Sequence, residues 1–160
     1  MKFFRLLKED LSNLHMKQTV LKDSEVQKIL HTYKDDLPLF QYMISKGMSK
    51  IGSPITLFFD KNDEFIGYIV YMVNFFKFNK KKQLDSWTAN RTAFKTINIS
   101  YVEVCDSVRR DKSRPRYGKE IIEDFIQSMK TQYDGMTLEA AEKPLIDYYA
   151  RFGFELIPNA

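Results

Sequence analysis

The residues best suited to chemistry lie in the second half of the chain, where a strand-like segment leads into a basic loop. Residues 97–108 are strand-like, and residues from Lys119 onward have helical spacing. Between them one acidic residue, Asp111, faces a concentration of basic ones: Arg109, Arg110, Lys112, Arg114, Arg116 and Lys119. Backbone N–H groups at a helix start attract anions, and a glycine such as Gly118 lets a phosphate approach the backbone closely. This order of parts predicts a phosphate-binding loop.

A second group of interest is the aromatic ending of the last predicted helix. Pro144 fits the first turn of this helix, and Gly153 ends it. Its core-facing residues follow at helical spacing: Leu145, Tyr148, Tyr149 and Phe152. A tyrosine hydroxyl can donate a proton, so this ending is a second candidate for chemistry.

Helices and strands that could position these groups are visible upstream. Ser24-Glu-Val-Gln27 has the spacing of a capping box and predicts a helix start, and Pro38 opens a further helix that Gly47 ends. A short polar turn separates the strand-like residues 55–59 from 65–73, and this pattern predicts a β-hairpin.

The remaining expected elements complete one α/β domain over residues 1–160. They are a first strand at Phe3–Leu7, a helix start at Glu9–Leu11, an extended hairpin or insert loop at 74–96, a helix at Lys119–Lys130, a turn at Asp134-Gly135, a strand at Met136–Ala140 and a closing strand at Phe154–Ile157. The apolar stripe of the helix at Lys119–Lys130 recurs at the helical period.

The order of these elements, with two motifs, resembles the coenzyme A-binding half of the GNAT N-acetyltransferase superfamily. The ending Tyr149-Ala-Arg-Phe-Gly153-Phe154 closely matches the superfamily's apolar-Tyr-x-x-apolar-Gly-Phe pattern. The loop pattern Gln/Arg-x-x-Gly-x-Gly/Ala falls on Ser113-x-x-Arg116-x-Gly118 when Val108 is the strand end, and its last position matches. The resemblance covers residues 97–157 and extends to the hairpin. It implies an α/β fold whose mixed sheet is largely antiparallel, has a splayed central pair of parallel strands and is flanked by helices.

The resemblance implies acetyl-CoA as the cofactor, held where the strands 97–108 and 136–141 separate. The pantetheine amides would pair with the main chain of Asp106, Ser107 and Val108. The pyrophosphate would rest on the loop and the helix start, where guanidinium groups add affinity. The residues implied in cofactor binding are Asp106, Ser107, Val108, Ser113, Arg114, Arg116, Tyr117, Gly118, Lys119 and Tyr149.

The implied reaction is direct transfer of an acetyl group to a primary amine within a ternary complex. An amine with a pKa of ~10 is protonated at neutral pH, so a base or a water chain must remove its proton. Tyr149 occupies the family's usual proton-donor position. The candidate bases are Glu103 and Asp106, with Glu139 on the next strand, and a water-relayed path is an equal alternative. Val102 stands where a strand carboxylate is often found.

The bulk composition restricts the class of protein. The 160 residues are 44% hydrophobic and 29% charged, which suits one domain with a core and a solvated surface. The chain has no apolar run of the ~20 residues that span a bilayer, and its start has no signal-peptide core, so we expect a cytoplasmic protein without a membrane partner. A single cysteine, Cys105, excludes an intramolecular disulfide, and with two histidines it does not favour a metal site.

Two other function classes compete with acetyl transfer. The departures from the loop pattern favour a GNAT-fold binding or regulatory module without transfer activity. Segment 75–82 interleaves phenylalanines with lysines, as nucleic-acid surfaces do, but no nucleic-acid motif accompanies it, so a solvated hairpin tip is favoured. The acceptor, a small-molecule amine or a protein amine, is left open, as is the oligomeric state, a homodimer included.

Overall fold

The computed structural model describes residues 14–77, 93–139 and 143–156. Some sequence-based predictions lie outside these ranges: the strand at Phe3–Leu7, the helix start at Glu9–Leu11 and most of the segment 74–96. Among the described residues, no helix has both the length and the apolar character needed to cross a membrane.

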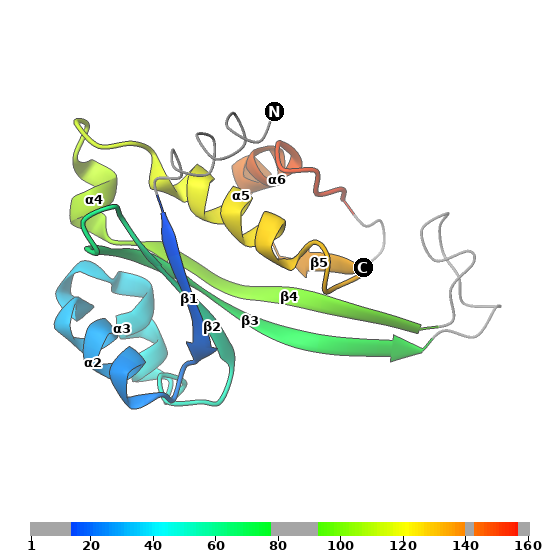
Figure 1. Ribbon diagram of the computed structural model, residues 1–160, viewed down its shortest axis with the longest axis horizontal. Coiled ribbons are helices and arrows are strands. Elements are labelled where there is room, and N and C mark those ends of the chain that lie inside the picture. The colour runs from blue at the N-terminus through cyan, green and yellow to red at the C-terminus, as the bar shows by residue number, and fades with distance from the viewer. Residues whose placement is uncertain (1–13, 78–92, 140–142, 157–160) are drawn as a thin grey trace, which may run out of the picture. The chain divides into compact units, whose positions relative to one another are not determined.

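The strands of the described chain form one sheet in the order β1-β2-β3-β4-β5 (Figure 1). They are β1 (His15–Val20), β2 (Pro54–Phe59), β3 (Phe65–Lys77), β4 (Ala93–Val104) and β5 (Gly135–Leu138). β1 pairs antiparallel with β2, β2 pairs antiparallel with β3, and β4 pairs parallel with β5. A mixed sheet with one parallel pair confirms the predicted fold class.

Helical segments flank this sheet. They are α2 (Ser24–Thr32), the short 3₁₀ turn η1 (Lys34–Asp36), α3 (Pro38–Ser45), α4 (Asp106–Arg110), α5 (Tyr117–Met129) and α6 (Lys143–Ala150). The helices predicted after Pro38, near Lys119 and near Pro144 are confirmed, and α5 begins two residues earlier than expected because Tyr117 is also helical.

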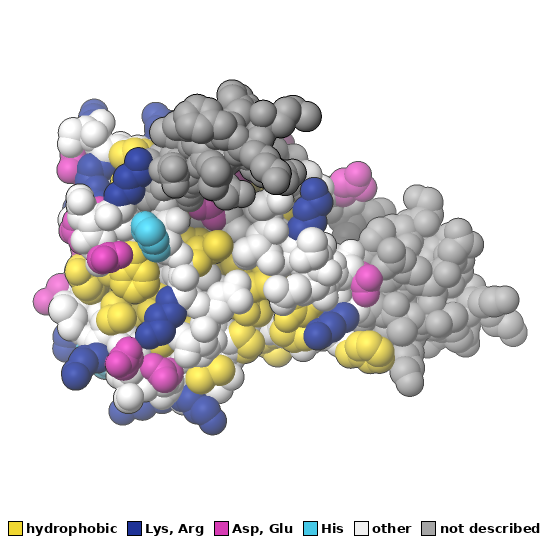
Figure 2. Space-filling model, in the orientation of Figure 1, with side chains coloured by type: hydrophobic (Ala, Val, Ile, Leu, Met, Phe, Trp, Pro, Cys, Tyr) yellow, Lys and Arg dark blue, Asp and Glu magenta, His cyan; other side chains and the backbone are white. Residues whose placement is uncertain are grey.

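The chain divides into two compact units. The first contains the residues up to Val70 together with Tyr101–Ile121. Its core is formed by β2, the first part of β3 and one face each of α2 and α3. The side chains without any exposure include Val26, Leu30, Phe40, Met43, Ile55, Leu57, Phe58, Ile66 and Tyr68. β2 is buried on both faces along its centre, which explains its continuous apolar sequence. On the face drawn in Figure 2, hydrophobic side chains lie among scattered basic and acidic ones.

A glycine lets β3 and the end of β4 approach closely in the first unit. A Cβ at Gly67 would lie against the carbonyl oxygen of Glu103 and 3.1 Å from the Cα of Val104. Backbone atoms cannot move aside as a flexible side chain can, so any larger residue at Gly67 would push the end of β4 away.

The second unit contains Tyr71–Ser100 and the residues from Ile122 onward. The rings of Tyr71 and Phe125 meet edge to face at 5.2 Å. Next to the first pair of the β4–β5 ladder, the carboxylate of Asp134 accepts the N–H of Lys95 at 2.8 Å. The N–H of Asp134 in turn donates to the carbonyl of Lys95, also at 2.8 Å, so the turn before β5 is fixed to β4.

Several local predictions are wrong. His15–Val20 is an edge strand that the sequence did not reveal, because its side chains are mostly exposed and lack a clear apolar alternation. The residues Phe154–Leu156 are not a strand. The capping box is also wrong, since Asp23 rather than Ser24 caps α2, accepting the N–H groups of Glu25 and Val26.

Candidate functional site

The end of β4 turns into a helix where the sequence predicted a longer strand. β4 ends at Val104, Cys105 is the N-cap, and α4 follows. The prediction of a strand over 97–108 is therefore wrong for its last residues. Asp106, Ser107 and Val108 do not form the strand edge that was expected to hold pantetheine.

Charge pairing at helical spacing explains why α4 forms. The carboxylate of Asp106 accepts a hydrogen bond from Arg109 at 2.6 Å and lies 3.8 Å from Arg110. These pairs are three and four residues apart, and a helix brings such side chains to one face. The apolar strand pattern thus gives way to a charge pattern at Asp106.

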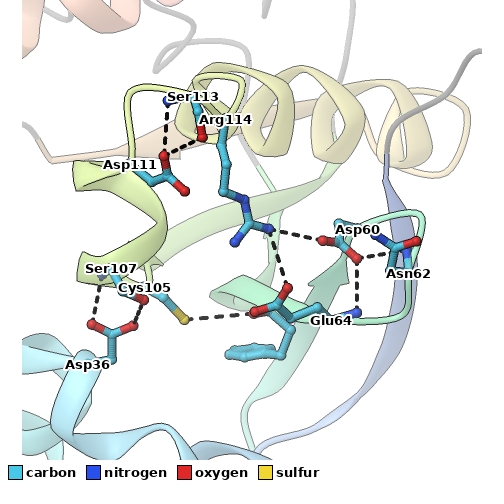
Figure 3. A network of polar contacts seen from close by, with 10 residues as sticks. Asp36, Asp60, Asn62, Glu64, Cys105, Ser107, Asp111, Ser113 and Arg114 are labelled. Atoms are coloured by element: carbon cyan, nitrogen blue, oxygen red, sulfur yellow. Dashed lines mark hydrogen bonds and ion pairs between the residues drawn. The ribbon is translucent and has the colours of Figure 1, made fainter.

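A carboxylate from a distant part of the chain caps α4. The N–H of Ser107 donates to Asp36 of η1 at 2.8 Å, and the Ser107 hydroxyl donates to the second oxygen (Figure 3). The N-cap Cys105 provides no side-chain cap of its own. The carbonyl of Val108 accepts the N–H of Asp111. The N–H of Ser107 and the carbonyl of Val108 are therefore used within the protein.

A second distant carboxylate, Glu103, caps α3. One oxygen accepts the N–H of Leu39 at 2.6 Å, and the other accepts the N–H of Phe40 at 3.0 Å. The hydroxyl of Tyr68 donates to the same oxygen as Phe40, at 2.7 Å. Leu37, the N-cap of α3, has no capping side chain. Both Glu103 oxygens thus have protein donors, which does not favour the predicted role as base.

Burial changes the ionisation of this pair. It raises the pKa of Glu103, although the hydrogen bonds from Tyr68, Leu39 and Phe40 oppose the shift. Burial also raises the pKa of Tyr68 far above its ordinary value, and the charge of Glu103 adds to that rise. Tyr68 therefore stays protonated and donates to Glu103.

A surface recess of about 340 Å³ lies where these elements meet in the first unit. One wall is the start of α3 at Pro38 and Leu39, and another is the end of β4 at 102–104. Asp106 and Arg109 of α4 complete the lining. Two predicted bases, Glu103 and Asp106, therefore line one recess, with Glu103 capping α3 and Asp106 in the more exposed position.

The loop between α4 and α5 is held by its own contacts. The hydroxyl and N–H of Ser113 both donate to Asp111, and these bonds lower the pKa of Asp111. The guanidinium of Arg114 donates to Asp60 at 3.0 Å and lies 3.8 Å from Glu64, both in the β2–β3 turn (Figure 3). Asp60 also accepts the N–H groups of Asn62 and Glu64. Arg114, predicted to bind pyrophosphate, is therefore already paired with carboxylates.

The start of α5 presents a different surface. Tyr117 is buried, and the Arg114 guanidinium lies 5.5 Å from the centre of its ring. Gly118 is half-buried, whereas Lys112, Arg116 and Lys119 are exposed. Of the predicted phosphate contacts, Arg116 and Lys119 are thus the basic side chains on the surface of the α5 start.

Tyr149 lies on α6 in the second unit. It is half-buried, and its ring meets Tyr148 at 5.3 Å and Phe154 at 6.1 Å. Burial raises its pKa, so its hydroxyl stays protonated in neutral solution. α6 ends at Ala150, and Gly153 lies in the turn that follows with a φ of +96°, a conformation that side chains rarely adopt. The role of Tyr149 as proton donor stays a prediction.

The parallel ladder of β4 and β5 is short. It runs from Thr96 opposite Gly135 to Ile99 opposite Leu138, whereas β4 continues to Val104. A side-chain hydrogen bond between Asn98 and Thr137, 2.9 Å long, closes the ladder near this end. The last residues of β4 thus have no β5 partner among the described residues.

Neither thiol nor metal chemistry is favoured in the described part of the chain. Cys105 is buried, and burial raises its pKa to about 12, so the thiol is protonated in neutral solution. Among the described residues, no group of three or more His, Cys, Asp or Glu side chains is placed to hold a metal ion.

Sequence reasoning missed Asp36 and Tyr68 as parts of this region, and it placed Arg109 only among the basic residues of the predicted phosphate-binding loop. Tyr68 was assigned to a hairpin strand and Asp36 received no role. Their partners are 35 and 71 residues away along the chain, so no local pattern could reveal them.

No protein-family model matches the chain, and no curated protein sequence matches it. Solved structures do match. A bacterial toxin has a TM-score of 0.60 and 14% identity, with 94% of this chain and 85% of that chain covered. An aminoglycoside acetyltransferase from an uncultured soil metagenomic sample has a TM-score of 0.54 and 13% identity, with coverage of 93% and 96%. A possible acetyltransferase from Clostridium difficile 630 has a TM-score of 0.53 and 13% identity, with coverage of 93% and 95%.

The fold is GNAT-like. At these identities the likeness extends to the fold alone, and proteins with different names share it. The function of this chain must therefore be argued from its own residues.

Proposed function

We propose that this protein transfers an acetyl group from acetyl-CoA to a primary amine. The observation that supports this most is the parallel β4–β5 ladder, which stops at Ile99 while β4 continues to Val104 within a GNAT-like fold. Neighbours with this fold include acetyltransferases. The end of β4 also lines the recess in the first unit.

The end of β4 fits the pantetheine arm of acetyl-CoA better than α4 does. The N–H of Cys105 donates to the carbonyl of Ile66 in β3. Because successive residues of a strand point their backbone groups in opposite directions, Val102 and Val104 direct theirs away from β3. We therefore assign the pantetheine contacts to Val102 and Val104 in place of Ser107 and Val108.

The exposed basic residues fit the phosphates. Arg116 and Lys119 lie at the start of α5, where the N–H groups of a helix start add positive potential. Arg114 has the different task of joining this loop to the β2–β3 turn through Asp60. An arginine at position 116 supplies charge where the family pattern has a glycine.

Bound acetyl-CoA would supply an activated thioester, whose carbon–sulfur bond breaks as the bond from the amine nitrogen forms. We assign Asp106 to hold the ammonium and to take its proton, since its carboxylate is the more exposed one of the recess. Tyr149 is the proposed donor of the proton that the sulfur gains. The nitrogen loses its second proton to solvent as the amide forms, and solvent restores the protonation of both side chains, so that one proton is released overall.

The first test measures acetyl-CoA binding to the full chain by calorimetry and transfer by detection of free thiol over a panel of amines. We expect heat of binding and thiol release with at least one amine. Arg116→Ala should weaken acetyl-CoA binding about tenfold, because it removes one charge-assisted contact to phosphate. Lys28→Ala, which removes an exposed charge on α2, is the matched control and should leave binding unchanged.

A GNAT-fold binding module without transfer activity is the second candidate. The engagement of Arg114 with Asp60 and the capping role of Glu103 favour it, because each removes a group that catalysis could use. Acetyl-CoA binding without thiol release over the whole panel would support this candidate. Absence of acetyl-CoA binding would contradict the transferase proposal.

A further inference from the structure

We propose that the recess between α3, the end of β4 and α4 binds a small aliphatic amine that also carries a carboxylate. Arg109 would hold the carboxylate, and Asp106 would hold the amine. This inference rests on the proposed function where it names the ligand as the acceptor, but the binding itself can be tested without acetyl transfer.

Two capping carboxylates join the elements that form the walls of the recess. Glu103 of β4 caps α3, and Asp36, which precedes α3, caps α4. Neither helix has a side-chain cap from its own N-cap residue. The hydrogen bonds of Glu103 to α3 are partly or fully buried, whereas those of Asp36 to α4 are exposed. Both join the walls, so a small ligand meets a preformed shape.

The more exposed charged side chains of the recess, Asp106 and Arg109, both belong to α4. Arg109 is 66% exposed and donates one hydrogen bond to Asp106. A guanidinium has five N–H donors, so the rest can receive a carboxylate. Arg110 lies 3.8 Å from the second oxygen of Asp106, which is too long for a hydrogen bond. Among the described residues that oxygen has no closer donor, so it can accept one from an ammonium group.

The balance of charge favours a ligand with an anionic group. Glu103 lines the recess, but it is mostly buried and both of its oxygens accept hydrogen bonds from Leu39, Phe40 and Tyr68. One carboxylate, Asp106, is then accompanied by two guanidinium groups. A ligand with only an ammonium would compete with both arginines, whereas an amine with a carboxylate satisfies Asp106 and Arg109 together.

The size and the apolar lining restrict the rest of the ligand. The volume of about 340 Å³ is at the lower end of small-molecule sites. Carbon surface in the lining comes from Pro38, Leu39, Val102 and Val104. A short methylene chain with an amine at one end and a carboxylate at the other fits this combination.

The test compares δ-aminovalerate with n-pentylamine, which has the same amine and chain length but no carboxylate. Binding of each probe to the full chain is measured by ligand-observed NMR titration without cofactor. We expect wild type to bind δ-aminovalerate at least about tenfold more tightly, because one charge-assisted pair distinguishes the probes.

The variants have opposite signatures. Arg109→Ala should weaken the binding of δ-aminovalerate about tenfold. It should leave the binding of n-pentylamine unchanged or make it tighter, because Asp106 loses a competing partner. Asp106→Asn should weaken both probes, and Arg109→Lys should retain part of the preference. Lys28→Ala should change neither. Arg109 is exposed, but its ion pair with Asp106 also supports α4, so a thermal melt of Arg109→Ala checks that the fold is intact.

Equal affinity of wild type for the two probes, or no binding of δ-aminovalerate, would overturn the inference. A parallel loss of both probes in Arg109→Ala would overturn it too, since that pattern indicates only a packing role. If δ-aminovalerate binds as expected but acetyl-CoA does not, the ligand site stands and the transferase proposal fails. If acetyl-CoA binds and n-pentylamine is acetylated at the same rate as δ-aminovalerate, the transferase proposal stands and the ligand assignment fails.

Discussion

The N–H groups at the starts of α2 and α3 both need hydrogen-bond acceptors, and the two acceptors lie at very different distances along the chain. In α2, Asp23 accepts the N–H groups of Glu25 and Val26 at 3.0 and 3.2 Å, two and three residues ahead of it. In α3, the N–H groups of Leu39 and Phe40 donate to Glu103, more than sixty residues along the chain.

The difference shows what each cap can do. A cap from the preceding residue stabilises its own helix and leaves the helix free to pack in any way. A cap from a strand fixes the helix to that strand, so α3 is tied to the end of β4 where the recess lies. The long-range cap therefore shapes the candidate site, and the local cap does not.

The largest expected effect comes from removing the long-range cap. Glu103→Ala leaves the N–H groups of Leu39 and Phe40 and the hydroxyl of Tyr68 without their acceptor in a buried place. We expect a loss of about 3–5 kcal/mol in the free energy of unfolding, measured by urea denaturation. Glu155→Ala, at an exposed position of the second unit, is the control. A loss as small as that of the control would contradict the capping role.

A smaller effect should appear in the pH dependence of the same site. The pKa of Glu103 is raised above its ordinary value of 4.5, so the folded state holds the proton more tightly than the unfolded state. Its contribution to stability is therefore fully present below the ordinary pKa and is lost as the pH rises through the raised pKa. Glu103→Gln has no such titration.

Wild type should therefore lose stability relative to Glu103→Gln as the pH rises. We expect the free energy of unfolding of wild type to fall relative to the variant as the pH rises from the ordinary pKa of the carboxyl. Urea denaturation over a pH series measures this difference. A relative gain of wild type with rising pH would show that the three hydrogen bonds outweigh burial.

The smallest effects concern the local cap of α2 and separate two residues that are neighbours in sequence. Asp23→Ala removes the acceptor of two N–H groups and should cost about 1 kcal/mol of unfolding free energy. Ser24→Ala, the first residue of the expected capping box, should cost less than about 0.5 kcal/mol. Thermal and urea unfolding of the two variants side by side checks this order. The reverse order would restore the capping box.

Much of the fold could be predicted because its signals are local. The apolar runs at 55–59 and 65–73, the glycine after Phe152 and the stripe of α5 each reflect a period or a turn within a few residues. The last residues of the 97–108 segment failed because their ion pairs favour a helix over the preceding strand pattern. β1 failed because an exposed edge strand needs no apolar alternation.

The sequence predicted where the candidate site lies, but not the roles of its residues. Glu103 and Asp106 were both chosen as carboxylates near the end of a strand, and both line the recess. Nothing in the spacing indicated that one would be occupied by the start of α3 and the other would face solvent beside Arg109. Likewise, the basic loop was visible, whereas the pairing of Arg114 with Asp60 was not.

By itself the sequence determined the strands and helices that have a period, and the loop in which basic residues gather, because these depend on neighbours a few positions apart. The tertiary structure alone decided which carboxylates cap, which arginines pair and which remain on the surface. Charges find partners in space, and the partners of Glu103, Asp36 and Arg114 lie more than thirty residues away in the chain. The free energy of a buried hydrogen bond depends on that meeting and not on the order of residues.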